Sequence, residues 1–418
     1  MAFTIDQSPQ SYTPAYNQII SVVNSSNYNL SNFKYLCDIY ITGKTFAGSP
    51  YLRLKAPPTP SGIGINKGVF DVRKILESYV SYNIGDTIYG FQQSSGCIIE
   101  YQMKFGEEYG PSSGVLTYPN QATDSVRYCW NGLFDFLKWT TYNAGTFVSN
   151  SYPNRKMLTD RVDKGKIRVN EKAWVYALTQ TSGDIYYAIV ETTQNNWANY
   201  QTYLIRNQYQ AVTNFKDRMI RFPAGWNMNS IPAGDFDFAT IPPPILNSNI
   251  QEYRISFKKF DGPYLYALQS FKVDTDCTNH SIYRLHFLNK LGGFDSFSFI
   301  RASHVSSNIK RSQFKKPIGK FISASNYGYE AADAEDINFY TEIKDAVQLN
   351  SDWVDEDTMQ WLEELVTSPV IFLDDVTYGL VKINITDTKF QQKKHLTEKV
   401  FNLQISIEYS YDRYRQRA

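Results

Sequence analysis

Phe401–Tyr411 reads FNLQISIEYSY, with apolar residues at every odd position and polar residues at every even position. Successive side chains of a β-strand point to opposite faces, so this pattern predicts one buried face and one solvated face, as in an antiparallel sheet. Helical spacing would instead scatter the same apolar groups around the whole cylinder. The stretch is therefore predicted to be a strand.

Shorter runs with the same alternation occur in Phe33–Ile41, Tyr253–Phe257 and Tyr283–Phe287. The last of these is followed by Leu291–Phe294, which contains two adjacent glycines. Glycine adopts positive φ without steric cost and so permits a tight reversal of the chain. Residues Ile282–Ile300 are therefore predicted to form a β-hairpin.

Two segments have helical spacing instead. A helix is predicted over 71–81, with Asp71 capping its first turn and with an apolar stripe formed by Val72, Ile75, Leu76, Tyr79 and Val80. A second helix is predicted from about Asp355 to Val366, where the acidic first turn complements the helix dipole. Ser368-Pro369 then ends it.

A chain of 418 residues is too long for one core, because cores stop growing at roughly 250–300 residues. We predict a mainly β, or β-rich α+β, protein with several Ig-like or sandwich- or barrel-type antiparallel domains and a few short helices. The predicted domains are an N-terminal β-rich domain (1–152) with the packed helix, a middle β domain (153–305) containing the hairpin, and a basic arm followed by a C-terminal α+β domain (306–418). Linkers are predicted near Asn150–Arg155, Ile241–Pro244 and Ser306–Lys320.

The charges are balanced, with a net charge of +1. Such a chain has no overall electrostatic attraction to nucleic acid or to an anionic membrane. The opening MAFTIDQSPQSY lacks a basic segment followed by an apolar one, so we expect no secretory signal, and synthesis in a cytoplasm. No apolar run approaches the roughly 18 residues of a membrane span, so no membrane insertion is expected.

Four cysteines stand at wide, irregular intervals, at Cys37, Cys97, Cys129 and Cys277. This spacing favours buried thiols over a disulfide framework. Cys277 and His280 have a gap that zinc could use, but no second closely spaced pair accompanies them, and chance is the favoured interpretation. We expect neither a metal nor another cofactor.

Catalytic patterns are nearly absent. Gly62–Gly68 superficially resembles a nucleotide-binding loop, but no Gly-Lys-Ser/Thr follows, and a glycine-rich turn is the favoured interpretation. The sequence contains neither a Gly-x-Ser-x-Gly nor a His-Glu-x-x-His motif. Abundant carboxylates leave a polysaccharide hydrolase open, although no pattern selects a pair. The prediction is a non-enzymatic protein with no small-molecule substrate.

Charge is distributed in two blocks near the C-terminal third. All charged residues from Ser306 to Lys320 are basic, whereas Glu330–Glu364 contains twelve acids and one base, Lys344. One interpretation is a solvated basic loop followed by an acidic surface. The other is a head-to-tail contact between subunits, in which the basic arm of one copy binds the acidic block of the next. The candidate interface residues are Lys310, Arg311, Lys315, Lys316, Lys320, Glu335, Asp336, Asp355, Glu356 and Asp357.

A resemblance to a known family is carried by several segments taken in order, which are Ser11–Ile41, Gly68–Leu76, Phe105–Gly110 with Trp130–Gly132, Phe287–Asp295, and Trp361–Leu365 with Ser368-Pro369. They resemble virion proteins of crAss-like and related phages of Bacteroidota. The resemblance implies a tail or virion structural protein of the ring or baseplate type, with Ig-like or similar β-domains. No catalytic residues carry over from the family.

The resemblance implies a subunit that oligomerises into a ring of six- or twelve-fold symmetry and forms part of the tail or connector conduit for genome delivery. Its implied partners are further copies of itself, other tail and virion proteins, and genomic DNA in transit, and its implied place is the virion tail. The alternative is a glycan-binding receptor-recognition protein, an adhesin on the tail exterior. In that case sugar rings would stack on the aromatic clusters Trp197, Tyr200 and Tyr203, or Tyr327, Tyr329 and Tyr340.

Overall fold

The structure, a computed structural model, divides the chain into two compact units. Unit 1 comprises Met1–Thr275 and Leu288–Asp295, and unit 2 comprises Asp276–Phe287 and Ser296–Ala418. Both consist mainly of antiparallel strands, with four short α-helices in the described part of the chain, which confirms the predicted mainly β class. The described residues are 3–44, 49–60, 66–85, 90–149, 155–161, 164–180, 184–195, 197–209, 214–237, 244–276, 279–387 and 401–414.

Some predicted features fall wholly or partly outside these described residues. They are the glycine-rich turn at Gly62–Gly68, the linkers at Asn150–Arg155 and Ile241–Pro244, and Cys277 with its zinc-like spacing.

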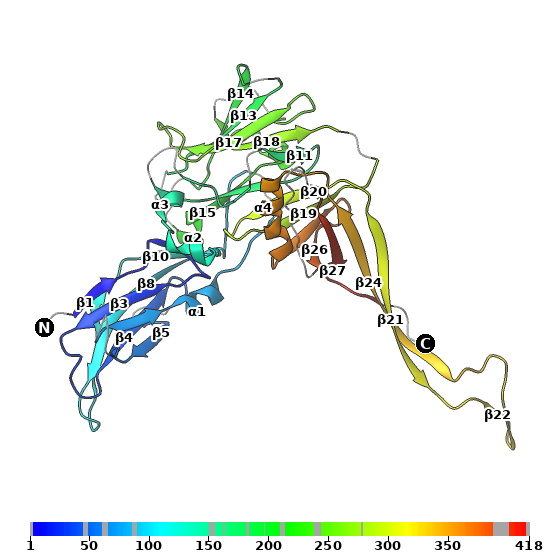
Figure 1. Cartoon of the computed structure of the whole chain (residues 1–418), viewed down its shortest axis with the longest axis horizontal. Helices are drawn as coiled ribbons and strands as arrows, with labels where there is room; N and C mark the ends of the chain where they lie inside the picture. Colours follow the sequence, from blue (N-terminus) through cyan, green and yellow to red (C-terminus); the bar gives the residue numbers. More distant parts are fainter. Residues whose placement is uncertain are drawn as a thin grey trace. The chain divides into compact units, whose positions relative to one another are not determined.

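The first half of unit 1 is built on two sheets with one core between them (Figure 1). The three-stranded sheet has the order β1 (Phe3–Gln7), β3 (Ile20–Ser25), β6 (Gly68–Asp71). The six-stranded sheet has the order β2 (Tyr12–Pro14), β10 (Arg127–Trp130), β8 (Ile98–Tyr109), β4 (Lys34–Ile41), β5 (Leu52–Ala56), with β9 (Leu116–Thr123) paired to β8. The predicted strand is confirmed as β4, and Tyr35, Cys37 and Ile39 are fully buried in this core. The other face is not solvated as the alternation predicted, because Leu36 and Asp38 are buried as well.

The first predicted helix is shorter than 71–81. It consists of α1 (Arg73–Leu76) and one 3₁₀ turn, η1 (Glu77–Tyr79). Asp71 ends strand β6, and its Oδ1 accepts hydrogen bonds from the backbone N–H of Arg73 at 3.0 Å and of Ile19 at 3.2 Å. The helix ends early because Ser81 donates its backbone N–H to Gly96 and not to the preceding turn. The predicted apolar stripe nevertheless packs on the core.

Replacing Leu76 with Asp should unfold the first half of unit 1. Leu76 is 0% exposed and packs in the core, and an unpaired buried charge costs several kcal/mol. The measurement is the thermal unfolding transition by circular dichroism. Ser78→Asp is the matched control, because Ser78 is exposed on the same turn. A wild-type transition in the Leu76→Asp protein would contradict this packing.

The second half of unit 1 has its own core between two further sheets. The six-stranded sheet has the order β11 (Gly165–Arg168), β18 (Gln269–Asp274), β17 (Glu252–Lys258), β13 (Tyr187–Thr193), β14 (Tyr200–Arg206), β16 (Phe236–Asp237). The smaller sheet has the order β12 (Trp174–Leu178), β15 (Met219–Pro223), β7 (Gln92–Gln93). Short helices lie in the connections, at α2 (Phe136–Thr140), α3 (Gly145–Val148), η2 (Phe215–Arg218), η3 (Trp226–Ser230) and η4 (Ala233–Asp235).

The change from one core to the other occurs near the predicted boundary at residue 152. The buried residues of the first core run up to Cys129, and those of the second run from Met157 to Val273, with Phe91 as the exception. Both cores nevertheless lie in one compact unit, because β7, from the first half of the chain, pairs with β15.

Unit 2 is built on one large sheet and one helix. The sheet has the order β20 (Phe294–Phe299), β19 (Tyr283–Leu288), β25 (Ile371–Asp375), β26 (Gly379–Ile385), β27 (Gln404–Tyr409), β24 (Asp336–Asn350), β21 (His304–Lys315), with β28 (Arg413–Tyr414) paired to β24. A separate pair is formed by β22 (Lys320–Ser323) and β23 (Asn326–Gly328). The helix α4 (Glu356–Thr367) confirms the second predicted helix. It begins after Asp355, whose Oδ1 accepts from the Thr358 N–H at 2.8 Å and so caps it.

The large sheet must curl, because its first and last strands in spatial order are neighbours in sequence. Only the residues between Phe299 and His304 connect β20 to β21, and the five steps from Phe299 to His304 span at most about 18 Å. The enclosed core contains Trp361 and Leu362 of α4. It also contains Leu403, Ile405 and Ile407, which confirms the predicted strand at the C-terminal end.

The predicted hairpin over 282–300 is confirmed as β19 and β20, joined by a turn at 289–293. Gly292 has a φ of +87°, and a Cβ there would lie 1.9 Å from the carbonyl oxygen of Asn131, so this position requires glycine. The prediction placed the hairpin in a middle domain ending at 305. In the structure β19 pairs with β25, as at Leu285↔Leu373, so unit 2 begins at Asp276, earlier than predicted.

Candidate interaction surface

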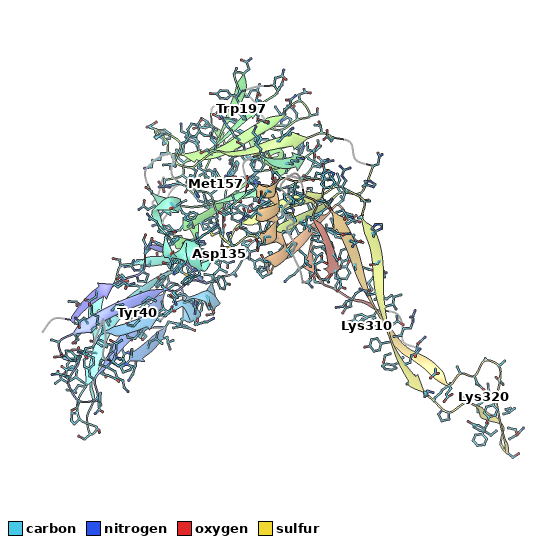
Figure 2. The ribbon with its side chains drawn as sticks, viewed as in Figure 1. Tyr40, Asp135, Met157, Trp197, Lys310 and Lys320 are labelled. Carbon is cyan, nitrogen blue, oxygen red and sulfur yellow. The ribbon has the colours of Figure 1, made fainter. Side chains whose placement is uncertain are left out.

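Strands β21 and β24 form a long antiparallel ribbon that carries Lys310, with Lys320 beyond it (Figure 2). Their register runs from His304↔Gln348 to Lys315↔Asp336. All residues of β21 are exposed. The prediction that Ser306–Lys320 is a linker or loop is therefore wrong over most of its length. A strand with both faces in water needs no apolar alternation, so its sequence resembles that of a loop.

The predicted basic residues face acidic residues of the same ribbon. Lys310 lies opposite Glu342 in the register. The Lys315 Nζ lies 3.7 Å from a carboxylate oxygen of Glu335 and 3.9 Å from one of Asp336, and the Lys320 Nζ lies 2.5 Å from Glu330. These side chains are about half exposed or more, and ion pairs of this kind contribute roughly 0–1 kcal/mol to folding.

The predicted acidic residues fall into two places. Glu335 and Asp336 belong to the ribbon, next to the basic residues, and the backbone oxygen of Glu335 also accepts from the Lys316 N–H at 2.9 Å. Asp355, Glu356 and Asp357 lie at the start of α4, where Asp355 caps the helix. The structure therefore brings the first group to the basic arm within one chain, and places the second group on a different element, α4.

Tyr327 and Tyr329, predicted from the sequence as part of an aromatic cluster, belong to a larger apolar cluster at the far end of the ribbon. Its side chains are all at least 40% exposed, with Phe321 at 72% and Tyr329 at 71%. Neighbouring rings contact each other edge to face, with centroids 5.3 Å apart for Phe321 and Tyr327. The only sequence signal was the density of aromatic residues at 327–340. We define the ribbon tip as Phe314, Ile318, Phe321, Ile322, Tyr327, Tyr329 and Phe339.

An open hollow of about 460 Å³ lies beside the ribbon tip. It is lined by Lys316, Pro317, Ile318, Tyr329 and Glu335. The Tyr327 hydroxyl donates to the Ile318 carbonyl at 2.7 Å, which holds the two sides of the tip together. The surface thus combines exposed rings, a depression and paired charges.

The base of the ribbon is fixed by an ionic contact. Asp345 of β24 accepts hydrogen bonds from Arg413 of β28 at 2.6 Å and from the Ser307 hydroxyl of β21 at 2.8 Å. The hydrogen bond from Arg413, and then that from Ser307, lower the pKa of the Asp345 carboxyl. Three strands are therefore joined at the point where the ribbon leaves the sheet.

The described part of the chain shows little sign of metal binding, cysteine reactivity or membrane-spanning helices. No group of three or more potential metal ligands occurs there. Burial raises the pKa of the Cys97 thiol to about 12 and raises the pKa values of the Cys37 and Cys129 thiols as well, so these groups stay protonated. Of the helices described, none has the length and apolar character needed to cross a membrane.

Comparisons with known proteins identify no family. No protein-family model matches the chain, and no curated protein matches it. Among solved structures, the full extracellular region of plexin A4 is similar over 98% of this chain, with 8% sequence identity and a TM-score of 0.17. This chain spans 39% of the length of that one. A similarity this weak carries no argument about fold or function.

Proposed function

We propose that this protein is a non-enzymatic structural subunit of a phage tail, which assembles into a closed ring and forms part of the conduit for genome delivery. The ribbon of each copy contacts the next copy around the ring. Its neighbours are other tail proteins, and DNA passes transiently through the conduit. It rests on the resemblance in sequence and on the ribbon.

The observation that carries the proposal is the exposed ribbon tip. Monomeric proteins rarely expose contiguous apolar patches larger than a few hundred Å², and aromatic side chains are enriched at the centres of interfaces. The nearby charges of Lys315 and Lys320 have acidic neighbours in the same ribbon. What the tip offers to a partner is therefore mainly apolar surface.

A contact between two different surfaces can close repeated copies into a ring. If the ribbon tip of one copy binds elsewhere on the next, the interface is heterologous, and repeated copies close into a ring when the rotation fits. Strand β21 lies at the end of the strand order in its sheet, so its outer backbone groups can also pair with another chain.

Mass photometry and negative-stain electron microscopy of the purified chain test the proposal. We expect a discrete oligomer whose class averages show a ring with a central hole. Hydrogen exchange at 314–339 should be slower in the oligomer than in the diluted protein. A strict monomer at all accessible concentrations would contradict the proposal.

Charge reversal tests the predicted head-to-tail pairing. Lys315→Glu with Lys316→Glu should lower the oligomeric fraction, because the arm then meets the acidic surface of the next copy with like charge. Glu356→Lys with Asp357→Lys should do the same from the other side. Mixing the two variants should restore assembly, since each altered surface then meets a complementary one. Unchanged assembly of each variant alone, by mass photometry, would exclude charge pairing between copies.

A further inference from the structure

A second exposed apolar surface lies on the short helix α2 of unit 1. Phe136 and Leu137, its first two residues, are each 79% exposed. Leu133, just before the helix, is exposed as well. Single apolar residues at a surface are common, but these two adjacent large side chains project almost wholly into solvent, so packing within the chain does not explain them. We define Phe136 and Leu137 as the α2 knob, which directly follows the Asp135 labelled in Figure 2.

The backbone that carries the α2 knob is fixed on both sides. Before the knob, Asn17 Oδ1 accepts from the Phe134 N–H at 2.7 Å, and Asn17 Nδ2 donates to the Phe134 carbonyl at 2.8 Å. After it, the Trp139 ring stacks on Tyr142 with centroids 5.0 Å apart, and the Trp139 N–H donates to the Asp135 carbonyl at 2.8 Å. A backbone held in place before binding has little freedom to lose, which favours a binding role for the knob.

Another strongly exposed pair lacks such support and serves as a comparison. Val376 and Tyr378 lie in the turn between β25 and β26 and are at least as exposed as the α2 knob. The turn is held by Asp375 Oδ1, which accepts from the N–H groups of Thr377 and Tyr378. High exposure is ordinary at the end of a tight surface turn.

The ribbon tip matches the α2 knob in shape and polarity. The knob is convex, because its side chains project from a short helix, whereas the tip has the open hollow with Ile318 and Tyr329 in its lining. The apolar side chains of the knob and the tip together expose on the order of 1,000 Å². Specific interfaces bury about 1,200–2,000 Å² in total, so this contact and a polar rim suffice for stable association.

The charges around the two surfaces are also complementary. The lining of the hollow contains one charge of each sign, Lys316 and Glu335. Next to the α2 knob lie Asp135 and Lys138, whose side chains are both more than half exposed. Opposite charges can therefore face each other in one orientation of the contact, which fixes its register more than its strength.

We propose that the α2 knob of one copy binds the ribbon tip of the next copy. The inference rests on the proposed ring and names the surface that receives the tip. The contact joins two different surfaces, so each copy uses its knob towards one neighbour and its tip towards the other.

Mass photometry of the full chain with Phe136→Ser and Leu137→Ser tests the knob. Both side chains are exposed, so the melting temperature should equal that of the wild type. Association should weaken roughly 30-fold or more, because apolar anchors at the centre of an interface carry most of its binding energy. Val376→Ser with Tyr378→Ser is the matched control, which should assemble as the wild type does.

Mixing two variants tests whether the knob and the tip bind each other. The knob variant keeps its tip, and the variant with Phe321→Ser and Tyr329→Ser keeps its knob. A pair with one copy of each therefore has one intact contact. At a concentration where neither variant assembles alone, the mixture should form discrete dimers and no larger oligomer.

The possible failures separate this contact from the ring. Wild-type assembly of the knob variant would overturn the contact and leave the ring in place. A mixture that stays monomeric would show that the knob and the tip bind different surfaces, and would overturn the contact as well. A wild-type chain that is a strict monomer would contradict the ring itself, and the contact with it.

Discussion

Excising the outer ribbon is expected to convert the oligomer into a folded monomer. The variant replaces residues 308–344 with Asn-Gly between Ser307 and Asp345, which are register partners, so a two-residue turn closes the shortened hairpin. The core residues Val347 and Leu349 remain, whereas the pairing of β28 with Glu342 and Ile343 is removed together with the ribbon. Loss of an aromatic binding patch costs about 2–4 kcal/mol, which weakens association roughly 30- to 1,000-fold.

The measurements are mass photometry for the oligomer and thermal unfolding for the fold. A full-length variant with Phe321→Ser and Tyr329→Ser is the matched control, because it keeps the strands and removes only two exposed rings. We expect it to weaken assembly part of the way. An excised protein that still forms the original oligomer would show that the ribbon is not the contact between copies.

A large loss of stability is expected from Asp184→Ala in unit 1. Asp184 and Arg155 have fully buried side chains joined by two hydrogen bonds, at 2.5 and 3.0 Å. Arg155 also donates to the Ser149 carbonyl and lies 3.4 Å from the Tyr266 hydroxyl. Removing the carboxylate leaves a buried guanidinium without its counterion, which costs about 3–5 kcal/mol.

Differential scanning calorimetry should show this as a fall in melting temperature on the order of 10 °C. Glu77→Ala is the control, because it removes an ion pair whose lysine, Lys74, is 76% exposed. This control should change the free energy of unfolding by less than about 1 kcal/mol. Replacing Arg155 and Asp184 together with Leu should recover part of the loss, since no charge is then left buried. A loss of stability in Asp184→Ala no larger than that in Glu77→Ala would contradict the burial of the pair.

The sequence predicted those elements in which one face of a strand or helix is buried. Strand β27 and helix α4 are examples, because burial selects apolar residues at fixed intervals and Asp355 is a local cap. The sequence did not predict β21 as a strand. With every residue exposed, nothing selects an alternating pattern, although the backbone is as extended as in β27.

The sequence patterns also did not predict contacts between segments that lie far apart along the chain. The pairing of β19 with β25 joins that strand to the sheet of unit 2, whereas the hairpin turn, within Leu288–Asp295, belongs to unit 1. The Arg155–Asp184 pair joins residues 29 positions apart. Neither leaves a periodic signal. The basic and acidic blocks were recognised, but their pairing across one ribbon, as at Lys315↔Asp336, depends on a register that single-sequence patterns do not specify.

The position of β27 in its sheet has a consequence for synthesis. This strand is among the last along the chain, yet it lies between β26 and β24, with pairs such as Leu349↔Ile405. While the ribosome makes the stretch from Asn350 to Gln404, which takes several seconds at about 5–20 residues per second, β24 has an unpaired inner edge. During this interval the unpaired edge of β24 can pair with a wrong strand. A chain truncated before Leu403 would lack β27 and leave that edge permanently exposed.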